Sequence, residues 1–440
     1  MAKILIYSPN IIGKSMAGAA IRPWEFAKAL SHEHEVILIS PGESDIQFQE
    51  FKILSFHDPI CKNHFKDAAI LIAQRLTLPL ALLAKRHQLK IIIDAYVPGP
   101  LELLEHFKHD PLNERERKVF SETSNMILSF KLADGILCAS EKQRELWLGF
   151  LLGRKLISPV LYDKDATLRQ FLSVVPFGLS IVPPKKTGKG LKEIFGLASS
   201  DKVLLWGGGI WNWFDPLSLI KAMKIINQKR SDIKLVFMGV KPPDPHLPTT
   251  EISRQAIELA KQLEIMNQCV FFNTDWIPYE ERQNFLLDAD IGVSTHFDHL
   301  ETHFSFRTRI LDYLWAELPM LATEGDSFAE LIERYQLGLI VPYQSEQAIA
   351  DAILHLIDDP HQLQQIKQNV ARIREQFYWN SVIAPLSQMI DRLSKEPPRD
   401  DLWRDGRNLF EFLITKIKER GLSSILQQYL FSKSFHEKSI

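Results

Sequence analysis

The stretch HFDHLETHFSFRTRILDYLWAELPMLAT, residues 296–323, decides the fold of this chain. The residues DADIGVST just before it, 288–295, predict a buried strand, and Ser305 is the expected N-cap of a helix that follows the polar turn. The apolar periodicity of that helix runs through Ile310, Leu311, Leu314 and Trp315. A strand, loop and helix in this order point the helix amides and its positive dipole end into the crevice beyond the strand. The stretch therefore predicts a parallel α/β sheet with a phosphate site.

Strand-like and helix-like segments alternate along the rest of the chain in two runs, which is typical of parallel sheets with crossover helices. The first run ends near residue 178, and the second begins at KVLLWGGG, residues 202–209. A polar segment rich in Pro, Gly and Lys, 183–190, predicts an interdomain linker between them. We therefore expect Rossmann-like domains at 1–180 and 181–378, a further helix at 379–395 and a helical extension at 396–440.

The stretch 296–323 resembles the donor-binding signature of the family-4 (group 1) retaining glycosyltransferases of GT-B fold. In that signature two carboxylates flank a Gly-Phe-Gly-like turn before Glu-Ala-Met-Ala-x-Gly-x-Pro. Here Asp312 takes the place of the second carboxylate in DYLWAELP, residues 312–319. Phe304 occupies the position of the first carboxylate, for which Glu301 is the nearest substitute, and SFR replaces the turn at 305–307.

This resemblance implies a GT-B fold, in which two Rossmann-like domains face each other across a cleft and the helix at 379–395 crosses back to the first domain. It also implies transfer of a sugar from a nucleotide diphosphate donor to an acceptor hydroxyl, with retention and without a metal or cofactor. The expected acceptor is a cell-surface polysaccharide or a glycolipid. The alternatives are a sugar-nucleotide epimerase or phosphorylase of the same fold, or a noncatalytic nucleotide-sugar-binding scaffold.

The chain departs from the family at the residues that neutralise the donor diphosphate. Ile210 and Asp215 occupy the positions of the family's Arg and Lys. Because a diphosphate in a partly dry cleft needs counter-charge, another cation must supply it. Arg307 is the first candidate, and Arg309 is the second. The alternative for Arg309 is an i,i+3 ion pair with Asp312 on the same helix.

Further donor-binding residues follow from the resemblance and from local chemistry. Asp312 is expected to accept hydrogen bonds from the ribose, and the amides of residues 304–307 are expected to bind the diphosphate. Trp276 either stacks on the base or packs in the core, and Trp211 either walls the sugar or packs between the domains. The complete donor-binding set is Gly18, Gly208, Gly209, Trp211, Trp276, His303, Phe304, Ser305, Phe306, Arg307 and Asp312.

Two carboxylates are the catalytic candidates, Glu301 and Asp94. Asp94 ends the strand KIIIDAY, in a region where similar enzymes often carry a histidine. It either stabilises an oxocarbenium-like centre and orients the acceptor, or caps the following turn. The spacing of His296, His299, Glu301 and His303 contains enough ligands for zinc but fits no familiar zinc motif, so we expect no metal.

Composition excludes several classes of protein. The net charge of −2 indicates no nucleic-acid partner, and three isolated cysteines indicate neither a disulfide framework nor a zinc site. The chain has neither a signal-peptide core nor an apolar run of the ~20 residues that span a bilayer, so we expect it in the cytoplasm. The extension at 396–440 has apolar residues at helical spacing with lysines nearby. It is expected either to lie on the inner face of the membrane or to pack on the protein body.

Overall fold

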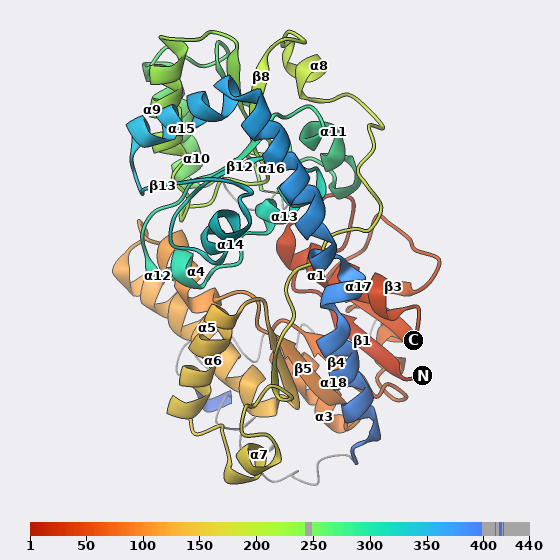
Figure 1. Cartoon of the computed structure of the whole chain (residues 1–440). Coiled ribbons are helices and arrows are strands. Elements are labelled where there is room, and N and C mark those ends of the chain that lie inside the picture. Colours follow the sequence, from red (N-terminus) through yellow and green to blue (C-terminus); the bar gives the residue numbers. More distant parts are fainter. Residues whose placement is uncertain (243–248, 398–409, 411–412, 416, 418–440) are drawn as a thin grey trace.

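The computed structural model describes residues 1–242, 249–397, 410, 413–415 and 417. It contains two α/β domains that lie end to end (Figure 1). All paired strands in both sheets run parallel, as the alternating pattern predicts. The predicted extension beyond residue 397 lies outside the described residues, apart from the five isolated positions at 410–417. No helix among the described residues is long and apolar enough to cross a membrane.

The first domain is built on a seven-stranded sheet of order β3-β2-β1-β4-β5-β6-β7. Apart from the edge strand at 52–55, its strands are rich in Ile and Leu and almost wholly buried, as expected for a parallel sheet covered on both faces. The strands are β1 (Lys3–Tyr7), β2 (Glu35–Ser40), β3 (Lys52–Ser55), β4 (Ile70–Ala73), β5 (Lys90–Asp94), β6 (Gly135–Cys138) and β7 (Leu172–Val174). The helices are α1 (Gly18–Leu30), α2 (Pro59–Asn63), α3 (Leu78–Arg86), α4 (Gly99–His106), α5 (Leu112–Leu132), α6 (Glu141–Gly153) and α7 (Pro159–Lys164).

The second domain is built on a six-stranded sheet of order β10-β9-β8-β11-β12-β13. The strands are β8 (Lys202–Trp206), β9 (Ile233–Phe237), β10 (Val270–Phe272), β11 (Ile291–Ser294), β12 (Met320–Thr323) and β13 (Gly338–Val341). The helices around it are α8 (Leu191–Phe195), α9 (Pro216–Asn227), α10 (Glu251–Gln262), α11 (Arg282–Leu286), α12 (Leu300–Phe304), α13 (Thr308–Trp315), α14 (Ser327–Tyr335), α15 (Glu346–Asp358) and α16 (Pro360–Ile373).

The chain returns to the first domain after α16. In Figure 1 the blue helices α16, α17 (Trp379–Val382) and α18 (Ala384–Lys395) follow one another from the second domain to the first. Tyr378 forms a parallel bridge to Leu179 in the connecting segment, and Trp379 stacks at a tilt on Phe177. The Met389 side chain of α18 lies where a Cβ on Gly135 would be, so only glycine allows this close approach to β6.

In each sheet the strand order reverses beside the strand that comes first in the sequence. β1 lies between β2 and β4, and β8 lies between β9 and β11. Ligands of such sheets bind beyond the carboxyl ends of the strands at this switch point. The topology therefore brings the loop after β1, the glycines at 207–209 after β8 and the segment after β11 to the same region between the domains.

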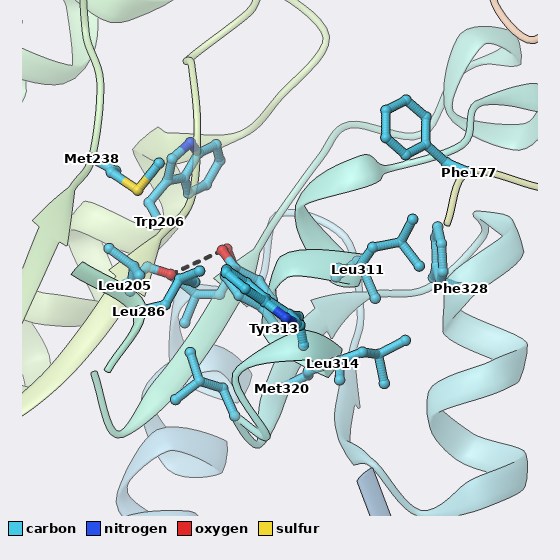
Figure 2. Packing of buried hydrophobic residues seen from close by; sticks show 14 of the residues in the cluster. Phe177, Leu205, Trp206, Met238, Leu286, Leu311, Tyr313, Leu314, Met320 and Phe328 are labelled. Carbon is cyan, nitrogen blue, oxygen red and sulfur yellow. Dashed lines mark hydrogen bonds between the residues drawn. The ribbon is translucent and has the colours of Figure 1, made fainter. Parts of the chain in front are cut away.

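The Tyr313 side chain of α13 connects this helix to the second sheet through hydrogen bonds. Figure 2 shows its ring buried among Leu205, Leu286, Leu314 and Met320, with its hydroxyl bonded to Leu205. The hydroxyl lies 3.0 Å from the Leu205 carbonyl and 2.8 Å from the Val293 carbonyl, and it accepts a 2.8 Å hydrogen bond from the Gly207 amide. One side chain thus joins β8, β11 and the glycine loop.

Tyr313→Phe is expected to lower the free energy of unfolding by about 1–3 kcal/mol, because buried backbone groups lose their partner while the ring stays. Denaturant unfolding checks this, with Tyr162→Phe as the control because Tyr162 is 53% exposed. Equal stability of Tyr313→Phe and the wild type would contradict the structural role of the hydroxyl.

Candidate active site

A cleft of about 590 Å³ lies between the two domains, at the switch points of both sheets. The first domain contributes the loop after β1, the end of β5 and helix α4. Nine of the predicted site residues line the cleft, and Glu301, His303, Phe304 and Ser305 do not. The nine are Gly18, Asp94, Gly208, Gly209, Trp211, Trp276, Phe306, Arg307 and Asp312.

Two helix N-termini meet in the cleft. A Cβ on Gly18, the first residue of α1, would lie 3.5 Å from the Tyr96 hydroxyl and 3.8 Å from Oγ1 of Thr308, the first residue of α13. Neither helix has a side-chain cap or an acidic residue in its first turn. Their first amides and positive dipole ends are therefore directed at an anion site.

Arg309 is a buried cation beside these helix ends. Its Nη2 donates a 2.8 Å hydrogen bond to the Gly209 carbonyl, and its Nη1 has no partner within the described part of the chain. Its guanidinium carbon lies 4.5 Å from the centroid of the Trp206 ring and 3.9 Å from that of Phe214. Burial lowers the pKa of Arg309 to about 9, which still leaves it charged at neutral pH. The side chain is thus a cation at the cleft that lacks an acidic partner among the described residues.

Arg307, the first candidate for the phosphate cation, is already neutralised. Its Nη1 and Nη2 donate to the two carboxylate oxygens of Glu301 at 2.8 Å and 2.7 Å, and both side chains are buried. The pairing arises because α12 turns Glu301 back toward the residue six positions later. Arg307 still borders the cleft, but its charge belongs to an internal ion pair.

Asp312 does not pair with Arg309, although their i,i+3 spacing allows it. Its carboxylate instead accepts a 2.9 Å hydrogen bond from Nε of Arg282, which lies over the rings of Tyr279 and Trp315. Asp312 remains 30% exposed, toward the cleft. Sequence reasoning missed Arg282, because the surrounding segment YEERQNF carries no motif and looks like an exposed helix.

The predicted N-cap Ser305 is wrong. A short helix, α12, forms inside the expected loop, and Ser305 ends it with its hydroxyl donating to the Thr302 carbonyl at 3.0 Å. Arg307 occupies the N-cap position of α13. The turn at 305–307 therefore has no capping side chain, which leaves the amides of α13 available.

Aromatic side chains flank the cleft on the second domain. Trp211 and Trp213 stack with ring centroids 5.8 Å apart, and His106 of α4 lies about 6.5 Å from them. The Trp276 indole donates a 3.1 Å hydrogen bond to the Met16 carbonyl of the first domain, with its ring beside Gly209. All three tryptophans line the cleft.

Gln143 of α6 also connects the two domains. Its Nε2 donates to the Tyr96 carbonyl at 2.7 Å and to the Phe304 carbonyl of the second domain at 2.9 Å. Its Oε1 accepts a 2.8 Å hydrogen bond from the Ala139 amide. The side chain is completely buried, so all its polar groups are used inside the protein.

Residues 192–372 match the family model of the glycosyl transferases group 1. The match places this segment, the second domain without its ends, among the group 1 glycosyl transferases. The matched segment covers α8 to α16 and therefore includes Arg309, Asp312 and Glu301. Comparison with curated protein sequences finds no significant match. The predicted resemblance to the group 1 glycosyltransferases is confirmed for this segment.

Solved glycosyltransferase structures share the whole two-domain architecture. WaaG, described as a glycosyltransferase involved in lipopolysaccharide biosynthesis, is 14% identical, with a TM-score of 0.59 over 89% of this chain and 100% of its own. Sucrose-phosphate synthase from Thermosynechococcus elongatus is 14% identical, with a TM-score of 0.59 over 89% and 99% of the two chains. HepE of Anabaena in complex with UDP-glucose is 14% identical, with a TM-score of 0.59 over 90% and 100%. The predicted GT-B fold is confirmed.

Asp215 and Ile210, which stand where the family has Lys and Arg, have structural roles in this glycosyltransferase. Asp215 caps α9 by accepting a 3.0 Å hydrogen bond from the Ser218 amide, and Ile210 is buried. Gly208 has a φ of 79°, a left-handed conformation that glycine adopts without strain. The glycine loop of this glycosyltransferase therefore approaches the cleft through its backbone and not through a cationic side chain.

Asp94 is held by a buried arginine in this glycosyltransferase. Arg22 of α1 donates to both Asp94 oxygens, at 2.7 Å and 2.9 Å, and to the Val175 carbonyl at 2.8 Å. Arg22 is completely buried, so its charge is used inside the first domain. Asp94 borders the cleft, with both oxygens engaged in the ion pair.

The histidines at 296–303 have separate partners and do not form a cluster among the described residues. His296 is fully buried with Nε2 3.4 Å from Asp326, whereas His299 caps α12 by accepting from the Thr302 amide at 3.2 Å. Within the described ranges, no three His, Cys, Asp or Glu side chains are placed to hold a metal ion.

Proposed function

We propose that the enzyme transfers a sugar from a nucleotide diphosphate donor to an acceptor hydroxyl, with retention and without a metal. The observation that carries this proposal is the meeting of two uncapped helix N-termini in one cleft with Arg309, a cation that has no acidic partner among the described residues. Helix amides and a guanidinium are the donors that bind a diphosphate in a partly dry site. They would also stabilise the charge that develops on the leaving diphosphate.

The remaining donor contacts follow from this position of the diphosphate. Asp312, held in place by Arg282, would accept hydrogen bonds from the ribose, while Trp276 and the glycines at 207–209 would border the nucleoside. Glu301 would act on the sugar only through Arg307, because both its oxygens are bonded to that residue. UDP-glucose is the donor we favour, because HepE, a structural relative, binds it.

The acceptor is proposed to be a cell-surface polysaccharide or glycolipid, and the cytoplasm is the proposed location. WaaG, a glycosyltransferase involved in lipopolysaccharide biosynthesis, shares the fold and supports this class of acceptor. The predicted contact of the residues beyond 397 with the inner face of the membrane stays a prediction.

A screen of UDP-, GDP- and ADP-sugars tests the proposed function. The expected result is binding and slow hydrolysis of one nucleotide sugar, measured by calorimetry and by release of the nucleoside diphosphate. A protein that binds a nucleotide sugar but neither hydrolyses nor transfers it would be a scaffold. A protein that binds none of them would refute the proposal.

Activity is expected to survive EDTA, because Arg309 and the two helix ends supply the positive charge that a divalent ion supplies elsewhere. Hydrolysis of the donor is measured before and after chelation, and again after addition of Mg²⁺ or Mn²⁺. Activity that is lost in EDTA and restored by either ion would contradict the metal-free mechanism.

A further inference from the structure

Among the described residues, four carboxylates line the cleft, and three of them have an arginine partner. Asp94 pairs with Arg22, Asp312 pairs with Arg282, and Glu122 pairs with Arg75 at 3.2 Å. The fourth is Glu102 of α4, whose carboxylate has no hydrogen bond or ion pair within the part of the chain that the structure describes. Within the described residues, the Glu102 carboxylate is therefore available to a ligand.

Glu102 lies on the side of the cleft that the first domain forms, facing the second domain. Helix α4 follows β5 of the first domain and contacts α12 of the second, so Glu102 lies opposite the segment that begins α13. The charged groups that face it are Glu301 and Arg307 from the second domain and Glu122 from α5. Nearby Tyr96 presents its hydroxyl toward the α1 and α13 helix ends.

The surroundings of Glu102 suit a group that takes up a proton near neutral pH. Burial in the cleft raises the pKa of Glu102 to about 8, and the negative charges of Glu301 and Glu122 add to this increase. The positive charge of Arg307 opposes it. A general base is most effective when its pKa lies near the working pH.

We propose that Glu102 is a catalytic residue that accepts the proton of the attacking acceptor hydroxyl. The inference rests on the proposed function. The acceptor oxygen bonds to the anomeric carbon on the same face from which the diphosphate departs, so that the configuration is retained. As it does so, its O–H bond breaks and the proton passes to the Glu102 carboxylate. The bond from the anomeric carbon to the diphosphate breaks at the same centre, and its electron pair leaves with the nucleoside diphosphate. The proton then returns to solvent through the cleft.

Hydrolysis of the nucleotide sugar found in the screen tests this role without knowledge of the acceptor, because water replaces the acceptor hydroxyl. Glu102→Gln is expected to lower kcat by roughly 10²- to 10³-fold, while calorimetry shows an unchanged Kd for the donor. The wild-type rate is expected to rise with pH through about 8, as Glu102 loses its proton, and this rise disappears in the variant.

Glu105→Gln is the matched control, since Glu105 lies one turn further along α4, outside the cleft lining and beside Lys108. It should keep both the rate and the pH dependence. Glu102→Asp, which keeps a carboxylate, should be slowed less than Glu102→Gln and should keep the rise with pH. That result separates a proton acceptor from a residue that only shapes the cleft.

Two results would overturn the role of Glu102 alone. One is hydrolysis by Glu102→Gln at the wild-type rate with normal donor binding. The other is loss of donor affinity together with the rate, which would make Glu102 a donor-binding or structural residue. A wild-type protein that binds no nucleotide sugar would instead refute the proposed function, before any variant is compared.

Discussion

Asp94→Ala is expected to lower the free energy of unfolding by about 3–5 kcal/mol, the loss typical of breaking one side of a buried ion pair. The change leaves the Arg22 guanidinium completely buried with only the Val175 carbonyl to accept from it. The charge would have to be hydrated inside the core of the first domain. Urea unfolding of wild type and variant measures the difference.

Asp67→Ala is the control, because Asp67 pairs with Lys3 at the surface with its side chain 65% exposed, and such pairs contribute about 0–1 kcal/mol. The double change Arg22→Met with Asp94→Leu should recover much of the stability, because apolar side chains replace both charges. If Asp94→Ala kept its stability but lost activity, Asp94 would be a catalytic residue and the structural reading of the pair would fail.

Arg309→Met is expected to weaken donor binding by about 1.5–3 kcal/mol, or roughly 10- to 150-fold in Kd, the range for a hydrogen bond to a charged group. Methionine keeps contact with the rings of Trp206 and Phe214 but cannot bind the diphosphate. Stability without the donor should stay the same or increase, because a buried charge without an acidic partner is removed.

Calorimetric titration with the donor measures the loss, and Arg254→Met, on the exposed face of α10, is the control. Unchanged affinity of Arg309→Met would contradict the assignment of the diphosphate to this residue. Equal weakening by Arg254→Met would indicate a nonspecific effect of net charge.

The order of strands and helices could be predicted from the sequence because apolar periodicity is a local property. The strand at 291–294 lies within the predicted strand at 288–295, and the helix at 308–315 lies within the stretch 296–323. The cap at Ser305 could not be predicted, because α12 depends on the capping of its own first turn by His299. The donor site at this end of the sheet was predicted from the family resemblance.

The partners of charged side chains were harder to predict than the helices and strands, because the tertiary fold determines which charges meet. Arg307 and Arg309 look alike in the sequence, yet only Arg307 meets Glu301. Arg282 reaches Asp312 from 30 residues away, and Arg22 reaches Asp94 across 72. No local pattern identifies such pairs. Arg309 and Glu102 can therefore be recognised as lacking a charged partner only from the tertiary structure, within the residues that it describes.

The hydrogen bonds of the Gln143 side-chain amide bear on any opening and closing of the cleft. Its bonds to Ala139 and Tyr96 lie inside the first domain, and only the bond to Phe304 crosses to the second. If the two domains separated, Gln143 would lose that single bond and would keep its orientation within the first domain. When the domains closed again, Gln143 would still present its amide to the Phe304 carbonyl, three residues before Arg307 at the start of α13.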